Sequence, residues 1–191
     1  MDVAFLGTLL FYLLSLLHIS LALIGLICAV TPFLLHALHR DKRWCRSLCP
    51  RASLFTTALS RISIGLRAPG WLLGKVGRVA ILIWFFANFT VALMSTIMVA
   101  AGRVEPMAHV RFLLAFRFPF ELPQLLTFSA PDFVVHFGYR LFSLMSTSTM
   151  LGLGLGVLFR PRSWCAICPI ATLTPLPKRS ERPATAAATA P

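Results

Sequence analysis

A long stretch without Asp, Glu, Lys or Arg lies near the amino terminus, at residues 3–38. About 20 consecutive apolar residues are enough for a helix to cross the hydrocarbon core of a bilayer. The rest of the 191-residue chain has the same character, since 58% of its residues are hydrophobic, 13% are charged, and the mean hydropathy is +0.81. A water-soluble core of this size does not need so apolar a composition, so the sequence predicts a membrane protein.

Two further stretches have the length and composition of membrane spans. Residues 79–101 are rich in Ile, Leu, Val and Phe and contain only Asn88 as a strongly polar residue, and residues 133–159 follow a helix start made by Ser129, Pro131 and Asp132. With a first span at about 4–38, residues 1–174 form one membrane domain. The predicted fold class is all-α, a polytopic membrane helical bundle of three transmembrane spans plus interfacial helices.

The stretch 102–131 is hydrophobic but is interrupted by charges and prolines: Arg103, Glu105, Pro106, Arg111, Arg117, Pro119, Glu121 and Pro123. A charged side chain at mid-bilayer costs about 3 kcal/mol on insertion scales, so this stretch is predicted to lie at the outer interface without crossing. Residues 52–66 are predicted to form a short amphipathic helix on the opposite, inner surface. The third span contains Ser148, Gly152 and Gly156 at four-residue spacing, which lets membrane helices approach closely.

Basic residues set the predicted orientation. Residues 39–78 hold one acid, Asp41, against Arg40, Lys42, Arg43, Arg46, Arg51, Arg61, Arg67, Lys75 and Arg78. Basic loops stay on the cytoplasmic side, so the amino terminus is predicted outside and the carboxyl end inside a bacterial cytoplasmic membrane. The net charge of +12 comes from residues that flank apolar spans, so no nucleic-acid partner is expected. Residues 175–191, rich in Pro, Ala and Thr, are predicted to be a disordered tail.

A short cysteine motif occurs twice, at residues 43–50 (RWCRSLCP) after the first span and at residues 163–169 (SWCAICP) after the last. Aligned on Trp44 and Trp164, each copy has a cysteine next to the tryptophan and a Cys-Pro pair three or four residues later. Four of the five cysteines of the chain lie in these copies. Three crossings, one before the first motif and two between the motifs, would bring both motifs to the cytoplasmic face.

Four thiolates on one face can hold a [4Fe-4S] cluster, a [2Fe-2S] cluster or a zinc ion. Arginines next to the cysteines would balance the negative charge of such a site, and two tryptophans would cover it or anchor the loops at the interface: Arg43, Arg46, Arg51, Arg162, Trp44 and Trp164. The fifth cysteine, Cys28, is predicted to be a packing residue.

Two other classes of function are open. In one, the chain is a structural or assembly subunit in which zinc joins the first span to the last. In the other, the cysteines carry out quinone-linked thiol-disulfide exchange, although the basic flanks place them in the reducing cytoplasm. There is no Ser-His-Asp set, paired carboxylates or phosphate loop, so a stand-alone enzyme is not indicated.

The sequences RWCRSLCPRASLF and RSWCAICPIATLT resemble the paired Cys-x3-Cys-Pro and Cys-x2-Cys-Pro motifs of NapH/NosR-type membrane iron-sulfur proteins. The resemblance covers both motifs and the order of spans and loops. It implies a multi-pass inner-membrane electron-transfer component with a [4Fe-4S] cluster on Cys45, Cys49, Cys165 and Cys168. The chain would be a short form that lacks the ferredoxin and flavin domains.

The same resemblance implies the partners. Electrons would pass between the quinone pool or a cytoplasmic donor and a redox partner protein, within membrane lipid. His36 and His39 are candidates to lie next to a quinone because they fall near the inner end of the first span. Homo-oligomers and hetero-oligomers both stay open, since each motif supplies only two ligands.

Overall fold

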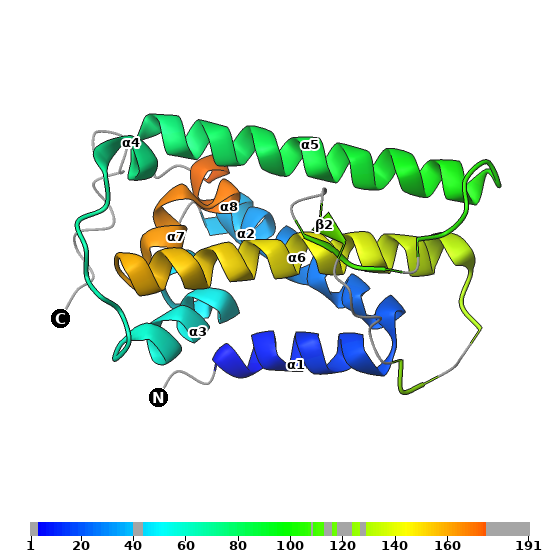
Figure 1. The fold of residues 1–191 in the computed structure, drawn as a ribbon, viewed down its shortest axis with the longest axis horizontal. Helices are drawn as coiled ribbons and strands as arrows, with labels where there is room; N and C mark the ends of the chain where they lie inside the picture. The colour runs from blue at the N-terminus through cyan, green and yellow to red at the C-terminus, as the bar shows by residue number, and fades with distance from the viewer. Residues whose placement is uncertain are drawn as a thin grey trace.

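The computed structural model describes residues 4–39, 44–107, 109–112, 116–117, 124–126 and 129–174. The predicted helical class is confirmed for these residues, which add only a small antiparallel hairpin to the helices (Figure 1). The elements are α1 (Phe5–Leu17), η1 (Ile19–Leu23), α2 (Ile24–His39), η2 (Trp44–Leu48), α3 (Pro50–Leu59), α4 (Gly70–Leu73), α5 (Lys75–Ala100), β1 (Arg111–Phe112), β2 (Phe116–Arg117), α6 (Asp132–Leu158), α7 (Ser163–Ile167) and α8 (Pro169–Leu173).

Three helical segments are long and apolar enough to cross a membrane: Ile19–Leu38, Lys75–Ala100 and Asp132–Leu158. The last two agree with the second and third predicted spans to within a few residues. In Figure 1, α5 and α6 run side by side, α1 lies on the other side of α6, and α2 crosses behind α6. Helix α6 is central: 56% of the residues in its most apolar stretch are buried, against 11% of those in the most apolar stretch of α5.

The first predicted span is shorter than expected, because the chain turns sharply at His18, where the backbone is extended (φ −156°, ψ 133°). The Nδ1 atom of His18 accepts a hydrogen bond from the Ser20 amide at 3.2 Å, and the Ile19 amide donates to Gln124 Oε1 at 2.7 Å. Helices α1 and α2 therefore run in opposite directions (Figure 1).

This turn also determines at which end of the molecule α1 begins. A Cβ added at Gly7, near the beginning of α1, would lie 3.4 Å from Pro50. The beginning of α1 thus lies at the same end of the molecule as the first cysteine motif. The single span over residues 4–38 had predicted the opposite end, so that prediction is corrected.

The segment after α5 folds back along α6. Met107 and Val110 are buried in a cluster with Ile19, Ala22, Tyr139 and Phe142. The Arg111 amide donates to Ser143 Oγ at 3.1 Å, and Ser143 lies about 16 Å along α6 from Asp132 at 1.5 Å per residue. The described part of this segment is thus inserted between helices, and does not lie flat at one end as the sequence predicted.

His136 of α6 holds the inserted segment in place. It is 2% exposed, its Nδ1 accepts from the Met107 amide at 2.9 Å, and its Nε2 lies 3.0 Å from Ser95 Oγ. Because an amide can only donate, Nε2 must carry the ring hydrogen. A polar side chain that pairs an inserted backbone in this way removes the cost of burying it.

We expect His136→Ala to lower the stability of the purified protein by about 2–3 kcal/mol, because it leaves the Met107 amide unpaired and opens a cavity. Thermal unfolding in a mild detergent measures this, with the exposed Ser60→Ala as the control. Equal melting temperatures for the two variants would contradict the role assigned to His136.

At the other end of α6, helix α3 packs tightly against it. Phe55 and Leu59 of α3 are buried in one cluster with Trp164 and Ile167 of α7. After α3 the chain makes a turn at residues 60–62 and then runs without regular structure along the end of α6, with the Ile64 amide donating to Val157 O at 2.8 Å. The helix predicted over residues 52–66 therefore ends at Leu59, and Phe55 faces the interior instead of an outer surface.

Candidate metal centre

The two Cys-Pro pairs fold in the same way. Cys49 is the residue before α3 and Cys168 is the residue before α8, both with extended backbone (φ −68°, ψ 113° and φ −57°, ψ 132°). Pro50 and Pro169 then occupy the first helical position, where the missing amide hydrogen costs nothing. Each Cys-Pro pair is thus a helix start, and the cysteine side chain sits at that start.

The two motifs differ by one residue, which the backbone absorbs. The first motif forms a π-helical turn in η2, where the Cys49 amide donates to Trp44 O at 2.7 Å. The second motif, with one residue fewer, forms the ordinary α-helical turn α7. A π turn is the usual way for a helix to take in one extra residue, so each tryptophan lies one turn before its Cys-Pro pair.

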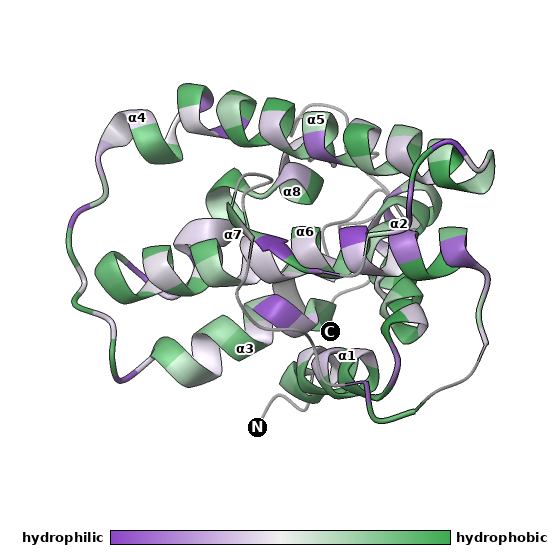
Figure 2. Cartoon of the chain, turned by 45° about the vertical axis from the view of Figure 1, so that its right-hand side comes forward, coloured by the Kyte–Doolittle hydropathy of each residue, from purple (hydrophilic) through white to green (hydrophobic). Residues whose placement is uncertain are grey.

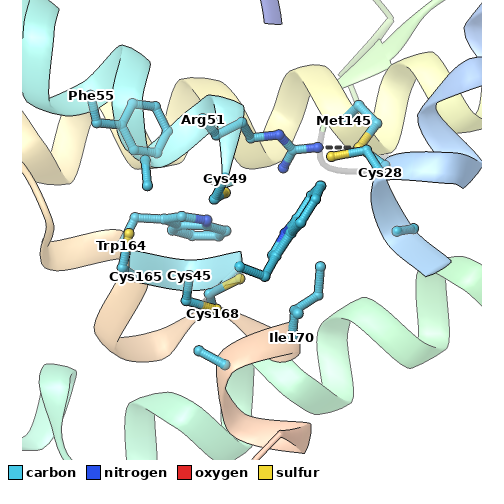
Figure 3. Close-up of a pocket in the computed structure, with 14 residues that line it drawn as sticks. Cys28, Cys45, Cys49, Arg51, Phe55, Met145, Trp164, Cys165, Cys168 and Ile170 are labelled. Atoms are coloured by element: carbon cyan, nitrogen blue, oxygen red, sulfur yellow. Dashed lines mark hydrogen bonds between the residues drawn. The ribbon is translucent and has the colours of Figure 1, made fainter. Parts of the chain in front are cut away.

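One cavity of about 60 Å³ brings the motifs together. The cavity has room for a group larger than a single water, which needs about 10–15 Å³ on the same measure. Its wall contains all five cysteines, the tryptophan of each motif, one arginine and one methionine (Figure 3): Cys28, Cys45, Cys49, Cys165, Cys168, Trp44, Trp164, Arg51 and Met145. The four cysteines predicted as ligands therefore lie around the same space, and all five cysteines are free thiols.

The thiols line this cavity without forming a ready coordination shell. Within the described residues, no three His, Cys, Asp or Glu side chains are set to bind one metal ion. Cysteine side chains at helix starts can rotate about χ1 while the backbone stays in place. Binding of a metal would require the thiols to turn toward a common centre.

The second motif provides a strongly desolvated thiol. The pKa of Cys165 is raised to about 12, chiefly by burial and to a lesser extent by the neighbouring thiols of Cys49, Cys168 and Cys45, whereas Arg162 acts to lower it. This thiol is therefore protonated at neutral pH. A metal ion would have to displace its proton, and a protonated thiol is a poor nucleophile for disulfide exchange.

Hydrogen-bond donors surround the sulfur of Cys168. Burial raises the pKa of this thiol as well, while the backbone amides of Ala171 and Ile170 donate to the sulfur and lower it. The positive charge of Arg51 also favours the thiolate. Amide and guanidinium groups next to a sulfur are the kind of surroundings that stabilise a metal-bound thiolate.

Arg51 is fixed between the cavity and α6. Its Nη1 donates to Ser148 Oγ at 2.7 Å, and its Nη2 contacts the sulfur of Met145 (Figure 3). Ser148 is thus a hydrogen-bond partner for the half-buried cation of Arg51, a role that its small-residue spacing did not indicate. The result is a positive charge held at one wall of a cavity lined by thiols.

The other predicted residues have varied positions. Trp164 is 4% exposed and forms a wall of the cavity, whereas Arg162 is exposed and its charge acts to lower the pKa of Cys165. His36 lies half-buried on α2 and does not line this cavity. Arg43, and the side chains of Arg46 and His39, lie outside the described residues.

The prediction from the sequence did not include two residues of the cavity. Cys28 was predicted to be a packing residue, but it lies in the wall with the motif cysteines. Met145 lies there too, on the face of α6 that contacts Arg51. Neither residue is part of a repeated motif, so nothing in the spacing of the cysteines pointed to them.

No family model matches this sequence, and no similar chain was found among curated proteins or solved structures. The resemblance to NapH/NosR-type proteins therefore depends only on the two motifs and on the order of spans and loops. The case for the site depends on its own geometry: two helix starts, one cavity and a set of positive or hydrogen-bond-donating groups around the thiols.

Proposed function

We propose that this chain is a membrane-bound electron-transfer protein that holds a [4Fe-4S] cluster on Cys45, Cys49, Cys165 and Cys168. The observation that carries the proposal is that these four cysteines, from two motifs far apart in sequence, line a single cavity. Four cysteine thiolates are the ligand set of such clusters. When bound, the cluster would take up and release one electron.

The residues around the cavity have distinct roles in this proposal. The four cysteines bind, while the amides of Ala171 and Ile170 and the guanidinium of Arg51 offset the negative charge of the thiolates. Trp164 and Phe55 pack against each other and exclude water from one side. The choice of an iron-sulfur cluster over zinc rests on this concentration of positive and donor groups, which raises the potential of an anionic redox centre.

The proposed setting is a bacterial cytoplasmic membrane that α5 and α6 cross, while α1 and the antiparallel segment Ile19–Leu38 form a helical hairpin that enters and leaves on one side. Because α5 and α6 run in opposite directions between the motifs, the chain leaves and returns at the end that carries the cysteines (Figure 1). Basic residues are concentrated at that end, which favours the cytoplasmic side. Electrons would pass there between the quinone pool or a soluble donor and a partner redox protein.

Helix α1 has a different place in the proposed topology. At 13 residues it spans about 20 Å, less than the roughly 30 Å of a hydrocarbon core. Its beginning lies beside Pro50, so the amino-terminal end of the described chain would be cytoplasmic too. The two ends of the described chain, α1 and α8, would then lie on the same side.

Purification without oxygen, followed by iron, sulfide and zinc analysis and EPR, tests the proposal. The expected result is about four iron and four sulfide per chain with a signal that appears on reduction. One zinc without iron would support the structural subunit instead. Absence of metal together with cysteines that cycle between thiol and disulfide on quinone addition would support the exchange protein.

Arg51→Gln is expected to lower the reduction potential of the cluster by about 60 mV, a tenfold change in a one-electron equilibrium, because the positive charge favours the more negative reduced state. Redox titration followed by EPR measures the shift. Arg61→Gln, which removes an exposed arginine from the same chain segment, is the control. Equal potentials for the two variants would contradict the role of Arg51.

A further inference from the structure

A second cavity, of about 20 Å³, lies on another face of α6 and has a different chemistry. It is formed between α5, α6 and the segment that folds back along α6, and it contains none of the cysteines. Figure 2 shows that hydrophilic segments interrupt the otherwise hydrophobic α5 and α6 within their length. The side chains that matter at this cavity are Asn88, Arg111, Arg140, Ser143 and Thr147.

Arg140 is the most unusual of these residues, because it lies well inside α6. It is about 12 Å beyond Asp132 at 1.5 Å per residue, and its Nε atom is buried with no hydrogen-bond partner in the part of the chain that the structure describes. Arg140 as a whole is half-buried, and a buried guanidinium nitrogen without a partner is costly in a low-dielectric surrounding. Such a residue in an apolar helix marks a site for a ligand or ion by default.

Arg111 adds a second positive charge to the cavity. It stands close enough to Arg140 for the two charges to oppose each other. The described residues contain only two acids, Glu105 and Asp132; both are exposed, and neither forms an ion pair with either arginine. The two arginines thus repel one another across a small cavity, with no described carboxylate between them.

The neutral side chains around the cavity do not supply the missing negative charge. Ser143 Oγ donates to Tyr139 O at 2.7 Å and accepts from the Arg111 amide at 3.1 Å. Asn88 Nδ2 donates one of its two hydrogens to Trp84 O at 2.7 Å, and Arg111 Nε donates to His109 Nε2 at 3.2 Å. Within the described residues, no carboxylate pairs with the guanidinium groups of the two arginines, so the described part of the cavity wall is cationic and offers hydrogen-bond donors.

We propose that this cavity binds one oxyanion group, of the phosphate or carboxylate kind, between the guanidinium groups of Arg111 and Arg140. The planar fork of a guanidinium donates two parallel hydrogen bonds to such a group. A volume of about 20 Å³ takes one charged group and not a whole organic cofactor. The site contains none of the cysteines, so this proposal can be tested independently of the iron-sulfur proposal.

Two sources can supply this group, a free anion or the head group of an anionic phospholipid. To test the first, the protein is purified in an uncharged detergent with chloride as the only anion, and its melting temperature is followed while inorganic phosphate or acetate is added. To test the second, the protein is placed in nanodiscs of phosphatidylglycerol or phosphatidylcholine, and retained lipid is measured by native mass spectrometry.

The variants are Arg140→Gln and Arg111→Gln, with the exposed Arg103→Gln as the matched control. In the wild type and in Arg103→Gln we expect a saturable rise in melting temperature with phosphate or acetate, or selective retention of phosphatidylglycerol. Each cavity variant should weaken this response about tenfold or more, as the loss of a charge-assisted hydrogen bond does. If Arg140→Gln fails to fold, Arg111→Gln carries the test, because Arg111 lies on a two-residue strand and not in α6.

The outcome separates the sources and decides the proposal. A response to phosphate or acetate without lipid identifies a free anion, and retention of phosphatidylglycerol alone identifies a head group. No saturable response and no selective lipid would overturn the proposal. An unchanged response in both cavity variants would do so as well.

Discussion

Cys49→Ser is expected to reduce the iron content of the purified protein to below about 10% of the wild-type value while the helices stay folded. Serine is a much weaker ligand for iron than a thiolate, and only three motif cysteines would remain. Cys49 caps α3 without a side-chain hydrogen bond, so the native thiol contributes nothing to that cap. Serine is one of the preferred cap residues, so the variant should keep or slightly increase the stability of α3.

Cys28→Ser is the matched control for this prediction. Cys28 lines the same cavity but belongs to neither motif, so its replacement should leave iron content near that of the wild type. Iron and sulfide analysis together with circular dichroism separates loss of the cluster from loss of fold. Iron that survives in Cys49→Ser would remove Cys49 from the ligand set, and iron lost in Cys28→Ser would add Cys28 to it.

The grouping of the motif cysteines around one cavity was predictable because it depends on coarse features. A motif that occurs twice, each time after a long apolar stretch, needs only an antiparallel pair of helices between the copies to bring them to one end. Residues 79–101 and 133–159 predicted such a pair, and α5 and α6 form it. Their limits were easy to place because charges or prolines flank the apolar stretches.

The turn at His18 was not predictable, because it has no local signal. Proline usually kinks or breaks a helix, and Pro32 lies in this stretch, yet α2 continues through it. Next to it, Thr31 Oγ1 donates to Ile27 O at 2.6 Å. What holds the turn at His18 is the bond from Ile19 to Gln124, a residue from a distant part of the chain.

The prediction for the inserted segment was wrong for a related reason. The cost of burying charges correctly argued against a membrane-crossing helix in residues 102–131. It could not reveal that His136 and Ser143 of α6 would accept hydrogen bonds from the backbone at Met107 and Arg111. These partners become visible only when the two segments lie together.

The small-residue spacing in α6 was predicted to let a second membrane helix approach, and the structure gives it another partner. Ser148 accepts from Arg51, Gly152 lies under the ring of Phe55, and Gly156 lies under Leu59. All three partners belong to α3. The spacing therefore fits α6 to the helix that begins at Cys49.

Gly152→Leu is consequently expected to separate the two cysteine motifs. A Cβ at Gly152 would collide with the ring of Phe55 and lie 3.2 Å from Cγ of Trp164. Phe55 is fully buried, so its ring cannot move aside unless α3 moves with it. Overpacking of this kind costs about 1–3 kcal/mol, and the displacement would carry Cys49 away from Cys165 and Cys168.

The control is the same substitution two residues later in the same helix. A Cβ at Gly154 meets no atom within 4 Å, so Gly154→Leu should keep both melting temperature and iron content, and the better helix propensity of leucine acts in its favour. Gly152→Leu should lose most of the iron and unfold at lower temperature. If it kept its iron, the motifs could not depend on the contact between α3 and α6, and the cluster would have to be held by the cysteine loops alone.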